Sequence, residues 1–149
     1  MAELYNLGAG ITMYDVSYGV GEKMFNKEDD VALVQWMLKR HFERSDKKAK
    51  LGKKYWMDFP NGVWGPRTND LVKIYQYDCM MNISNADFEL SGKIYPIGGC
   101  GGLNRSVTAL LNLSMAGHFR NYYTNPKSDP CLYFDAKEMF DRIGTAKPA

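Results

Sequence analysis

The chain has 149 residues, of which 45% are hydrophobic and 24% are charged, and its formal net charge is +2. This length allows one domain with a core of its own and is too short for two of ordinary size, while the composition excludes disordered and collagen-like classes. A net charge of +2 is too small to indicate a nucleic-acid partner.

The first part of the chain, residues 1–27, is rich in glycine and tyrosine and predicts an extended arm or a short hairpin. Ile11–Val16 is the stretch with the composition of a strand. A helix is expected to begin near Glu28, with Asn26 or Asp29 as its N-cap. Acidic residues in its first turn would complement the helix dipole.

Two glutamines lie within apolar helical faces. Gln35 follows Val31 by four residues and precedes Leu38 by three, and Gln76 repeats this spacing in a second helix. A buried amide without partners would cost on the order of 1–3 kcal/mol. We therefore expect both glutamines to point inward and to bind the backbone of neighbouring loops.

A basic segment follows the first helix. Lys39–Lys54 holds eight basic and two acidic residues, so this segment carries +6 and the rest of the chain −4. Such a segment is either a solvated connection or a surface for an anionic partner, such as a cell-wall polymer, lipid headgroups or nucleic acid.

The strongest local signal is the stretch Asn61–Gln76. Gly62 and Gly65 bracket Trp64, which predicts a tight turn, and a proline then provides a fixed φ for a helix expected over Pro66–Met81. The Trp64 ring fits two roles, a plug between helices or a surface that stacks on a sugar.

The rest of the chain alternates links and helices. Ser91–Ile97 predicts a second turn with an extended segment, Gly98–Gly102 predicts a flexible loop, and a third helix is expected from about Asn104. A short helix is predicted over Asp135–Ile143, and residues 145–149 are expected to be loose. The turn-then-helix order thus occurs twice, which favours a compact, mainly α-helical domain.

The cysteines indicate no metal site. Cys79, Cys100 and Cys131 are widely spaced and form no C-x-x-C pair. Cys79 lies on an apolar helix face and is expected to be buried, whereas Cys100 and Cys131 are either free or joined in one bridge.

No segment has the pattern of a membrane span or of a cleaved signal peptide. We therefore expect a protein that is cytoplasmic as synthesised, and that acts in the periplasm or cell wall if it is exported without a signal peptide. Neither nucleic acid nor membrane insertion is expected.

Catalytic motifs were sought along the chain. His41 and His118 are the two histidines, which excludes a His-rich metal site. Ser17 does not fit a G-x-S-x-G elbow, and the glycine clusters lack phosphate-loop spacing. Asp87 and Glu89 form the one carboxylate pair near a turn, which is little for a glycosidase. We therefore expect no catalytic residue, metal or cofactor.

Three stretches, Asp30–Leu38, Asn61–Gln76 and Gly92–Ile94, together resemble the peptidoglycan-binding-like domain. That family has a D-V-x-x-[LV]-Q-x-x-L helix, a [DN]-G-x-[FWY]-G-x-x-T turn, an [AL]-[VI]-x-x-[FY]-Q helix and a second D-G-like turn before a third helix. The resemblance covers roughly residues 20–118. Its central matches are Asn61, Gly62, Trp64, Gly65, Thr68, Leu71, Val72, Tyr75 and Gln76.

The resemblance implies a compact three-helix bundle that binds bacterial cell-wall peptidoglycan without catalysis. On this interpretation, residues 20–120 form the domain, residues 1–19 an N-terminal extended arm, and residues 121–149 a C-terminal extension with a short extra helix. The three parts are expected to make a single folded unit. The basic loop is longer than the usual connection of the family, and Gly98–Gly102 separates the second turn from its helix.

Ligand-binding residues are expected around the first turn. Arg67 opposes the dipole at a helix start, so it is a candidate for binding a carboxylate of a peptide stem or muramyl group bidentately, with an ion pair to Asp70 as the alternative. Asn61 and Tyr95 are expected to bind amides and hydroxyls. The aromatic side chain that packs on a sugar face is expected to be one of Tyr55, Trp56 and Trp64.

Two other functions fit the same sequence. The fold could act as a protein-interaction or structural subunit of a cell-envelope, phage or secretion assembly, with contacts made by the arm and the C-terminal helix; the missing signal peptide favours this alternative. A minor alternative is a small cell-wall hydrolase with an atypical site.

Overall fold

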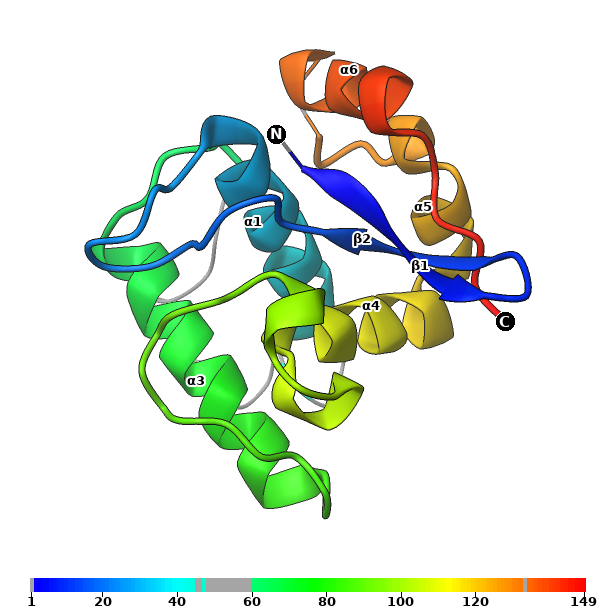
Figure 1. The fold of residues 1–149 in the computed structure, drawn as a ribbon. Helices are drawn as coiled ribbons and strands as arrows, with labels where there is room; N and C mark the ends of the chain where they lie inside the picture. Colours follow the sequence, from blue (N-terminus) through cyan, green and yellow to red (C-terminus); the bar gives the residue numbers. More distant parts are fainter. Residues whose placement is uncertain (1, 45–46, 48–59, 133) are drawn as a thin grey trace.

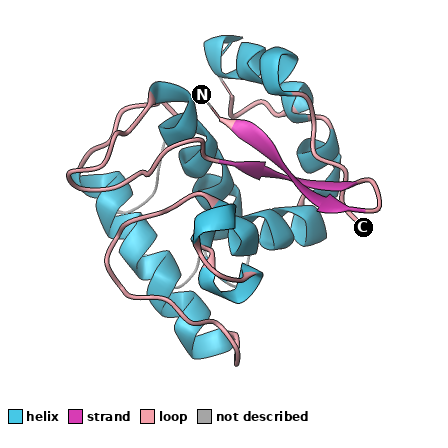
Figure 2. Cartoon of the chain, viewed as in Figure 1, coloured by secondary structure: helices cyan, strands magenta, loops and turns pink. Residues whose placement is uncertain are grey.

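The computed structural model describes residues 2–44, 47, 60–132 and 134–149 (Figure 1). Within these residues the chain is mainly α-helical, with one small two-stranded sheet (Figure 2). The strands are β1 (Glu3–Gly8) and β2 (Ile11–Asp15). The helices are α1 (Glu28–Phe42), α3 (Pro66–Asn82), α4 (Val107–His118), α5 (Arg120–Thr124) and α6 (Phe134–Ile143).

The N-terminal residues form a hairpin, one of the two predicted forms, and this hairpin belongs to the core. β1 and β2 are antiparallel, with Glu3 opposite Asp15. Tyr14 and Val16 are fully buried. The Asn112 side chain on α4 accepts a hydrogen bond from the Tyr14 backbone N–H and donates one to the Tyr14 carbonyl, both of 2.8 Å. A buried amide thus fastens the hairpin to α4.

α1 begins at Glu28 as predicted, but the predicted caps are wrong. The N-cap is Lys27, and no side chain caps this helix end. Asn26 has a positive φ of 50°, and its side-chain amide is bonded instead to the backbone N–H and carbonyl of Gly21, each at 2.8 Å. Asn26 therefore closes the preceding loop rather than the helix.

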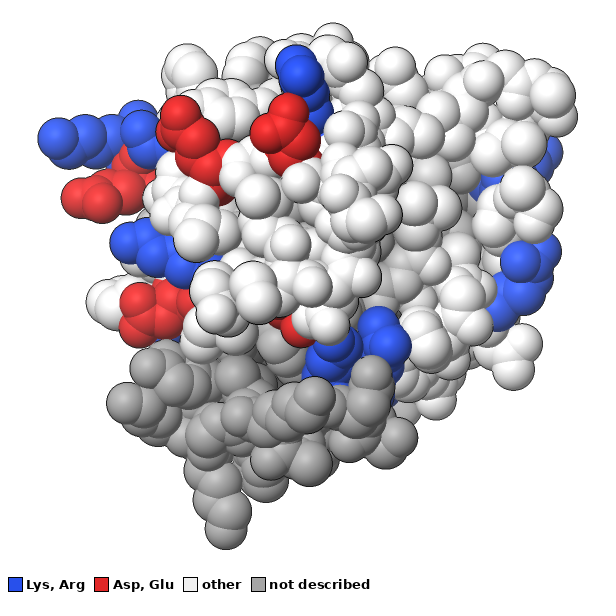
Figure 3. Space-filling view, turned by 90° about the horizontal axis from the view of Figure 1, so that it is seen from below, with Lys and Arg blue, Asp and Glu red and all other residues white. Residues whose placement is uncertain are grey.

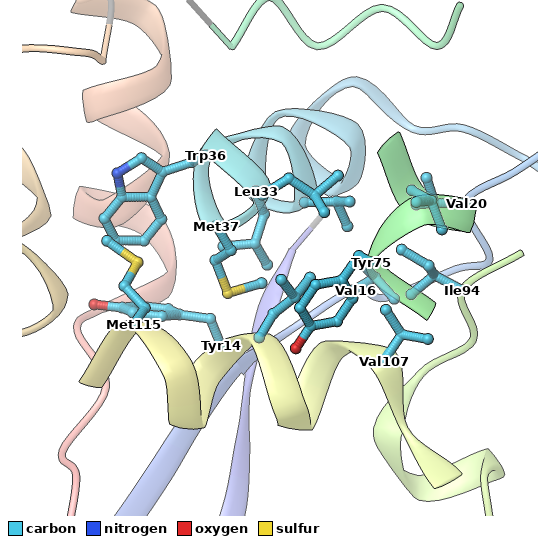
Figure 4. Packing of buried hydrophobic residues seen from close by; sticks show 14 of the residues in the cluster. Tyr14, Val16, Val20, Leu33, Trp36, Met37, Tyr75, Ile94, Val107 and Met115 are labelled. Atoms are coloured by element: carbon cyan, nitrogen blue, oxygen red, sulfur yellow. The ribbon is translucent and has the colours of Figure 1, made fainter. Parts of the chain in front are cut away.

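α1, α3 and α4 surround the main core. Figure 4 shows Leu33, Trp36 and Met37 of α1 facing Tyr75 of α3 and Met115 of α4, all of them buried. The predicted helix over Pro66–Met81 is confirmed to within one residue. The third helix begins at Val107 and not at Asn104, because Leu103–Arg105 forms a short 3-10 helix and the hydroxyl of Ser106 caps α4 by accepting from Ala109 N–H.

The C-terminal segment is ordered to near its end. The predicted last helix is confirmed as α6, whose Met139 and Phe140 are buried. The prediction that residues 145–149 are loose is wrong, because Ala146 is buried and Lys147 exchanges two hydrogen bonds with Thr12 of β2. The chain end therefore lies along the hairpin, as Figure 1 shows.

Asp129 joins this segment to α1. Its carboxylate is fully buried and accepts hydrogen bonds of 2.8 Å from Trp36 Nε1 and from Arg40 Nε, and a second bond from the Arg40 guanidinium. Although burial opposes ionisation, these donors hold the pKa of Asp129 below its ordinary value. The pair is a buried ion pair with its hydrogen bonds satisfied, and such a pair is costly to break.

We predict that Asp129→Ala lowers the free energy of unfolding by about 3–5 kcal/mol, because it leaves the Arg40 charge buried without its partner. Urea unfolding followed by circular dichroism measures this loss. The matched control is Asp141→Ala, which removes an exposed carboxylate paired with Lys127 and should change stability by less than about 1 kcal/mol. Equal effects of the two substitutions would contradict the role given to Asp129.

Candidate functional site: the turn cluster and three hollows

The turn at Asn61 and Gly62 is held by Gln35, as the sequence predicted. The Gln35 side chain is 2% exposed, and its Oε1 accepts from the backbone N–H groups of Asn61 and Gly62 at 3.0 and 2.9 Å. Its Nε2 donates to the carbonyl of Val63 and to Thr68 Oγ1, at 3.0 and 3.1 Å. One buried amide therefore fixes both sides of the turn.

Gln76 holds the second turn in the same way. Its Oε1 accepts from Gly92 N–H at 2.8 Å, and its Nε2 donates to the carbonyl of Lys93 at 3.3 Å. Gly62 and Gly92 have positive φ angles of 75° and 74°, which residues with a Cβ rarely adopt. The two turns thus share one arrangement, in which a buried glutamine is bonded to the backbone of a glycine turn. The inward orientation predicted for both glutamines is confirmed.

The loop before α1 pairs with the second turn, and the first residue of α1 packs against the first turn. Val20 and Ile94 exchange backbone hydrogen bonds of 2.9 and 2.8 Å in an isolated antiparallel bridge. At the other turn, Gly62 lies so close to Glu28 that an added Cβ would be 2.6 Å from Glu28 Cγ. We call the three segments together, residues 17–28, 61–69 and 91–95, the turn cluster.

The predicted ligand-binding residues occupy different places in this cluster. Asn61 is exposed, but its Oδ1 already accepts from Val63 N–H at 2.9 Å. Trp64 is half-buried and packs against the main core, as a plug would. Arg67 is exposed on the first turn of α3, and Tyr95 is 49% exposed. Tyr55 and Trp56 lie outside the described residues.

Asn61 and Tyr95 line two separate hollows. The hollow beside Asn61 has a volume of about 160 Å³ and is lined by Glu28, whose carboxylate suits a cationic group, and by Asp29, which pairs with Arg142 at 2.9 Å. The hollow beside Tyr95, of about 210 Å³, contains both basic and acidic side chains. The residues that line it are Gln76, Phe88, Glu89, Ser91, Lys93, Tyr95, Cys100, Arg105 and Val107.

The predicted basic segment is only partly described. Lys39, Arg40 and Lys47 pair with Glu43, Asp129 and Asp78, respectively. Lys48, Lys50, Lys53 and Lys54 lie outside the described residues. Figure 3 shows acidic and basic side chains next to one another along one edge of the face that it draws.

A larger hollow of about 520 Å³ lies around His41, and sequence reasoning missed it. His41 Nδ1 is 2.9 Å from Ser114 Oγ, and its Nε2 is 3.3 Å from Asp78 Oδ2. The three residues come from α1, α3 and α4, so no sequence spacing could reveal the cluster. The sequence gives one indication that His41 is buried, since it follows Leu38 by three residues on the apolar stripe of α1.

Burial lowers the pKa of His41 to about 4, so the imidazole is neutral at pH 7. The Asp78 carboxylate can only accept, which places the ring proton on Nε2 and leaves Nδ1 to accept from the Ser114 hydroxyl. A neutral imidazole bonded in this manner has the donor and acceptor pattern of a general base beside a hydroxyl nucleophile.

The structure also bears on disulfides, on metal ligands and on membrane-spanning helices. All three cysteines are free, so Cys100 and Cys131 are not joined, and Cys79 is buried as predicted. Among the described residues, no group of histidines, cysteines and carboxylates could hold a metal ion. In the same part of the chain, no helix is both long enough and apolar enough to cross a membrane.

Comparison of the chain with protein-family models, with curated proteins and with solved structures gives no match. The resemblance to the peptidoglycan-binding-like domain therefore stays a prediction from residues and spacing.

We predict that His41 makes the protein less stable in acid. The unfolded chain takes up a proton on this residue near pH 6.5, whereas the folded chain does so only near pH 4. The contribution of the neutral ring is complete above pH 6.5 and is lost as the pH falls toward 4, by on the order of 3 kcal/mol. Urea unfolding at several pH values in this range measures it, and His41→Gln should remove this part of the slope.

The matched control is Asp15→Asn, which removes a titration of opposite sign. Burial raises the pKa of Asp15 to about 7, so its contribution is present in acid, below the ordinary pKa of 3.8, and is lost as the pH rises through 7. In Asp15→Asn, the free energy of unfolding should therefore decrease less as the pH rises toward 7, and the contribution of His41 should remain. An unchanged slope in His41→Gln would contradict the assignment.

Proposed function

We propose that this chain is a non-catalytic binding domain for bacterial cell-wall peptidoglycan. In this proposal α1, α3 and α4 form a compact three-helix bundle of the peptidoglycan-binding type. The observation that carries the proposal is the pair of glutamine-locked glycine turns. Gln35, Gly62 and Gln76, which make these turns, are among the residues on which the resemblance to the family rests.

The chemistry of the turn cluster suits a peptide stem. Such stems carry both amines and carboxylates. The carboxylate of Glu28 beside Asn61 would bind an ammonium group, and Arg67, which is exposed at the start of α3, would bind a carboxylate. Tyr95 and the basic residues of the second hollow would contact a neighbouring part of the polymer.

A pull-down on purified sacculi tests the proposal. We predict that the wild-type protein is retained, and that Arg67→Ala weakens retention by roughly tenfold through the loss of one charged hydrogen bond. Arg120→Ala, at another exposed arginine, is the matched control and should bind like the wild type. No retention of the wild type would overturn the function, and full retention of Arg67→Ala would overturn the role of that side chain.

A small hydrolase is the second candidate, favoured by the Ser114–His41–Asp78 contacts in the largest of the three hollows. In that case Ser114 would be the nucleophile and His41 the base that takes its proton. A zymogram with cell wall as substrate separates the two functions. We predict no clearing by the wild type. Clearing that is lost in Ser114→Ala would establish the hydrolase in place of a purely binding domain.

For a protein-interaction module, the sequence predicts that the N-terminal arm and the C-terminal helix contact the partner subunits. Tyr14 of the hairpin and Met139 of α6 are buried within this chain and are not free for such contacts. Leu7 of the hairpin is 37% exposed, and three further apolar side chains are exposed on one face of α3, Tyr77, Met80 and Met81.

A further inference from the structure

Two aromatic side chains of the turn cluster are exposed side by side. Phe25 is 72% exposed and Tyr18 is 47% exposed, and their ring centroids are 5.2 Å apart with the planes at 48°. The ammonium group of Lys27 lies 5.7 Å from the centroid of the Tyr18 ring. The two rings therefore form a small exposed apolar surface beside a positive charge.

A fully buried carboxylate fixes the backbone at this surface. Asp30 is 0% exposed, and its two oxygens accept from the backbone N–H groups of Ser17 and Tyr18, each at 3.0 Å. A buried carboxylate is costly unless donors satisfy it, and here its donors include two amides of the loop. Tyr18 is thus held in position by a group in the core.

The other end of the loop is held in a strained conformation. Lys23 and Asn26 have positive φ angles of 63° and 50°; this region costs a lysine roughly 1–2 kcal/mol, whereas asparagine tolerates it. Between them, Met24 is half-buried against Gly19 while Phe25 is directed to solvent. The neighbouring apolar side chain of Met24 is thus partly covered, whereas Phe25 is exposed.

We propose that Tyr18 and Phe25 form a platform on which sugar rings of a polysaccharide stack, with Lys27 bonded to their hydroxyl or carboxylate oxygens. The inference rests on the proposed function and deepens it, because it adds the glycan strand to the ligand of the turn cluster. The C–H face of a pyranose ring is apolar and flat, and its rim is polar, which matches two aromatic rings beside an ammonium group.

The small size of the surface supports a sugar over a protein partner. A stable protein interface needs roughly 800 Å² on each partner, far more than two rings supply. A glycan strand presents its rings one after another, so one sugar ring can pack on Phe25 and the next on Tyr18. The rigid loop would bind it without a large ordering cost.

Titration with a soluble β-1,4-linked N-acetylglucosamine hexamer, followed by calorimetry, tests the platform. We predict that Phe25→Ala weakens binding roughly tenfold and that Phe25→Trp retains it, since the second variant keeps an aromatic face. Tyr77→Ala removes another exposed aromatic side chain, on α3, and should bind like the wild type. Circular dichroism should show the same fold in all three variants.

The outcomes separate this inference from the proposed function. No binding of the hexamer by the wild type, with sacculi still retained, would overturn the platform and leave the proposed function standing. Equal binding by Phe25→Ala and the wild type would also overturn the platform. Binding of the hexamer without retention on sacculi would overturn the proposed function and keep the platform as a sugar site.

Discussion

The turn cluster depends on two buried amides, Gln35 and Gln76. Each uses its oxygen and its nitrogen to satisfy backbone groups of a turn that has no strand or helix partner of its own. Without these amides, the N–H groups of Gly62 and Gly92 would be buried with no acceptor, at a cost comparable with a large part of domain stability. The start of α1 and the loop before it are placed by these turns, because Glu28 packs on Gly62 and Val20 pairs with Ile94.

A second set of buried polar groups joins the two chain ends to the helices. Asn112 binds the backbone of Tyr14 in the hairpin, and its Oδ1 also accepts from the Tyr123 hydroxyl at 2.6 Å. Asp129 joins the C-terminal segment to α1 through Trp36 and Arg40. The terminal segments therefore complete the core of the helices and are not appendages to it.

The sequence predicted those features of the fold that depend on residues close together in the chain. The apolar stripes of α1 and α3 and the inward glutamines followed from helical spacing, and the turn before α3 followed from its glycines. The burial of the hairpin did not, since the partner of Tyr14 is 98 residues away. The Ser114–His41–Asp78 cluster was also beyond prediction, because each member belongs to a different helix and no motif joins them.

Four buried polar side chains, Asp15, Asp30, Gln35 and Gln76, bind the backbone of segments that connect the helices. Asp15 accepts from the N–H groups of Val16 and Ile97, and Asp30 accepts from those of Ser17 and Tyr18. A helix satisfies the hydrogen bonds of its own backbone, but a loop needs partners from elsewhere. Where buried carboxylates and amides supply these partners, the loop is held in one conformation. A loop fixed in this way presents exposed side chains such as Phe25 in one orientation, and a ligand that binds them does not have to order the loop first.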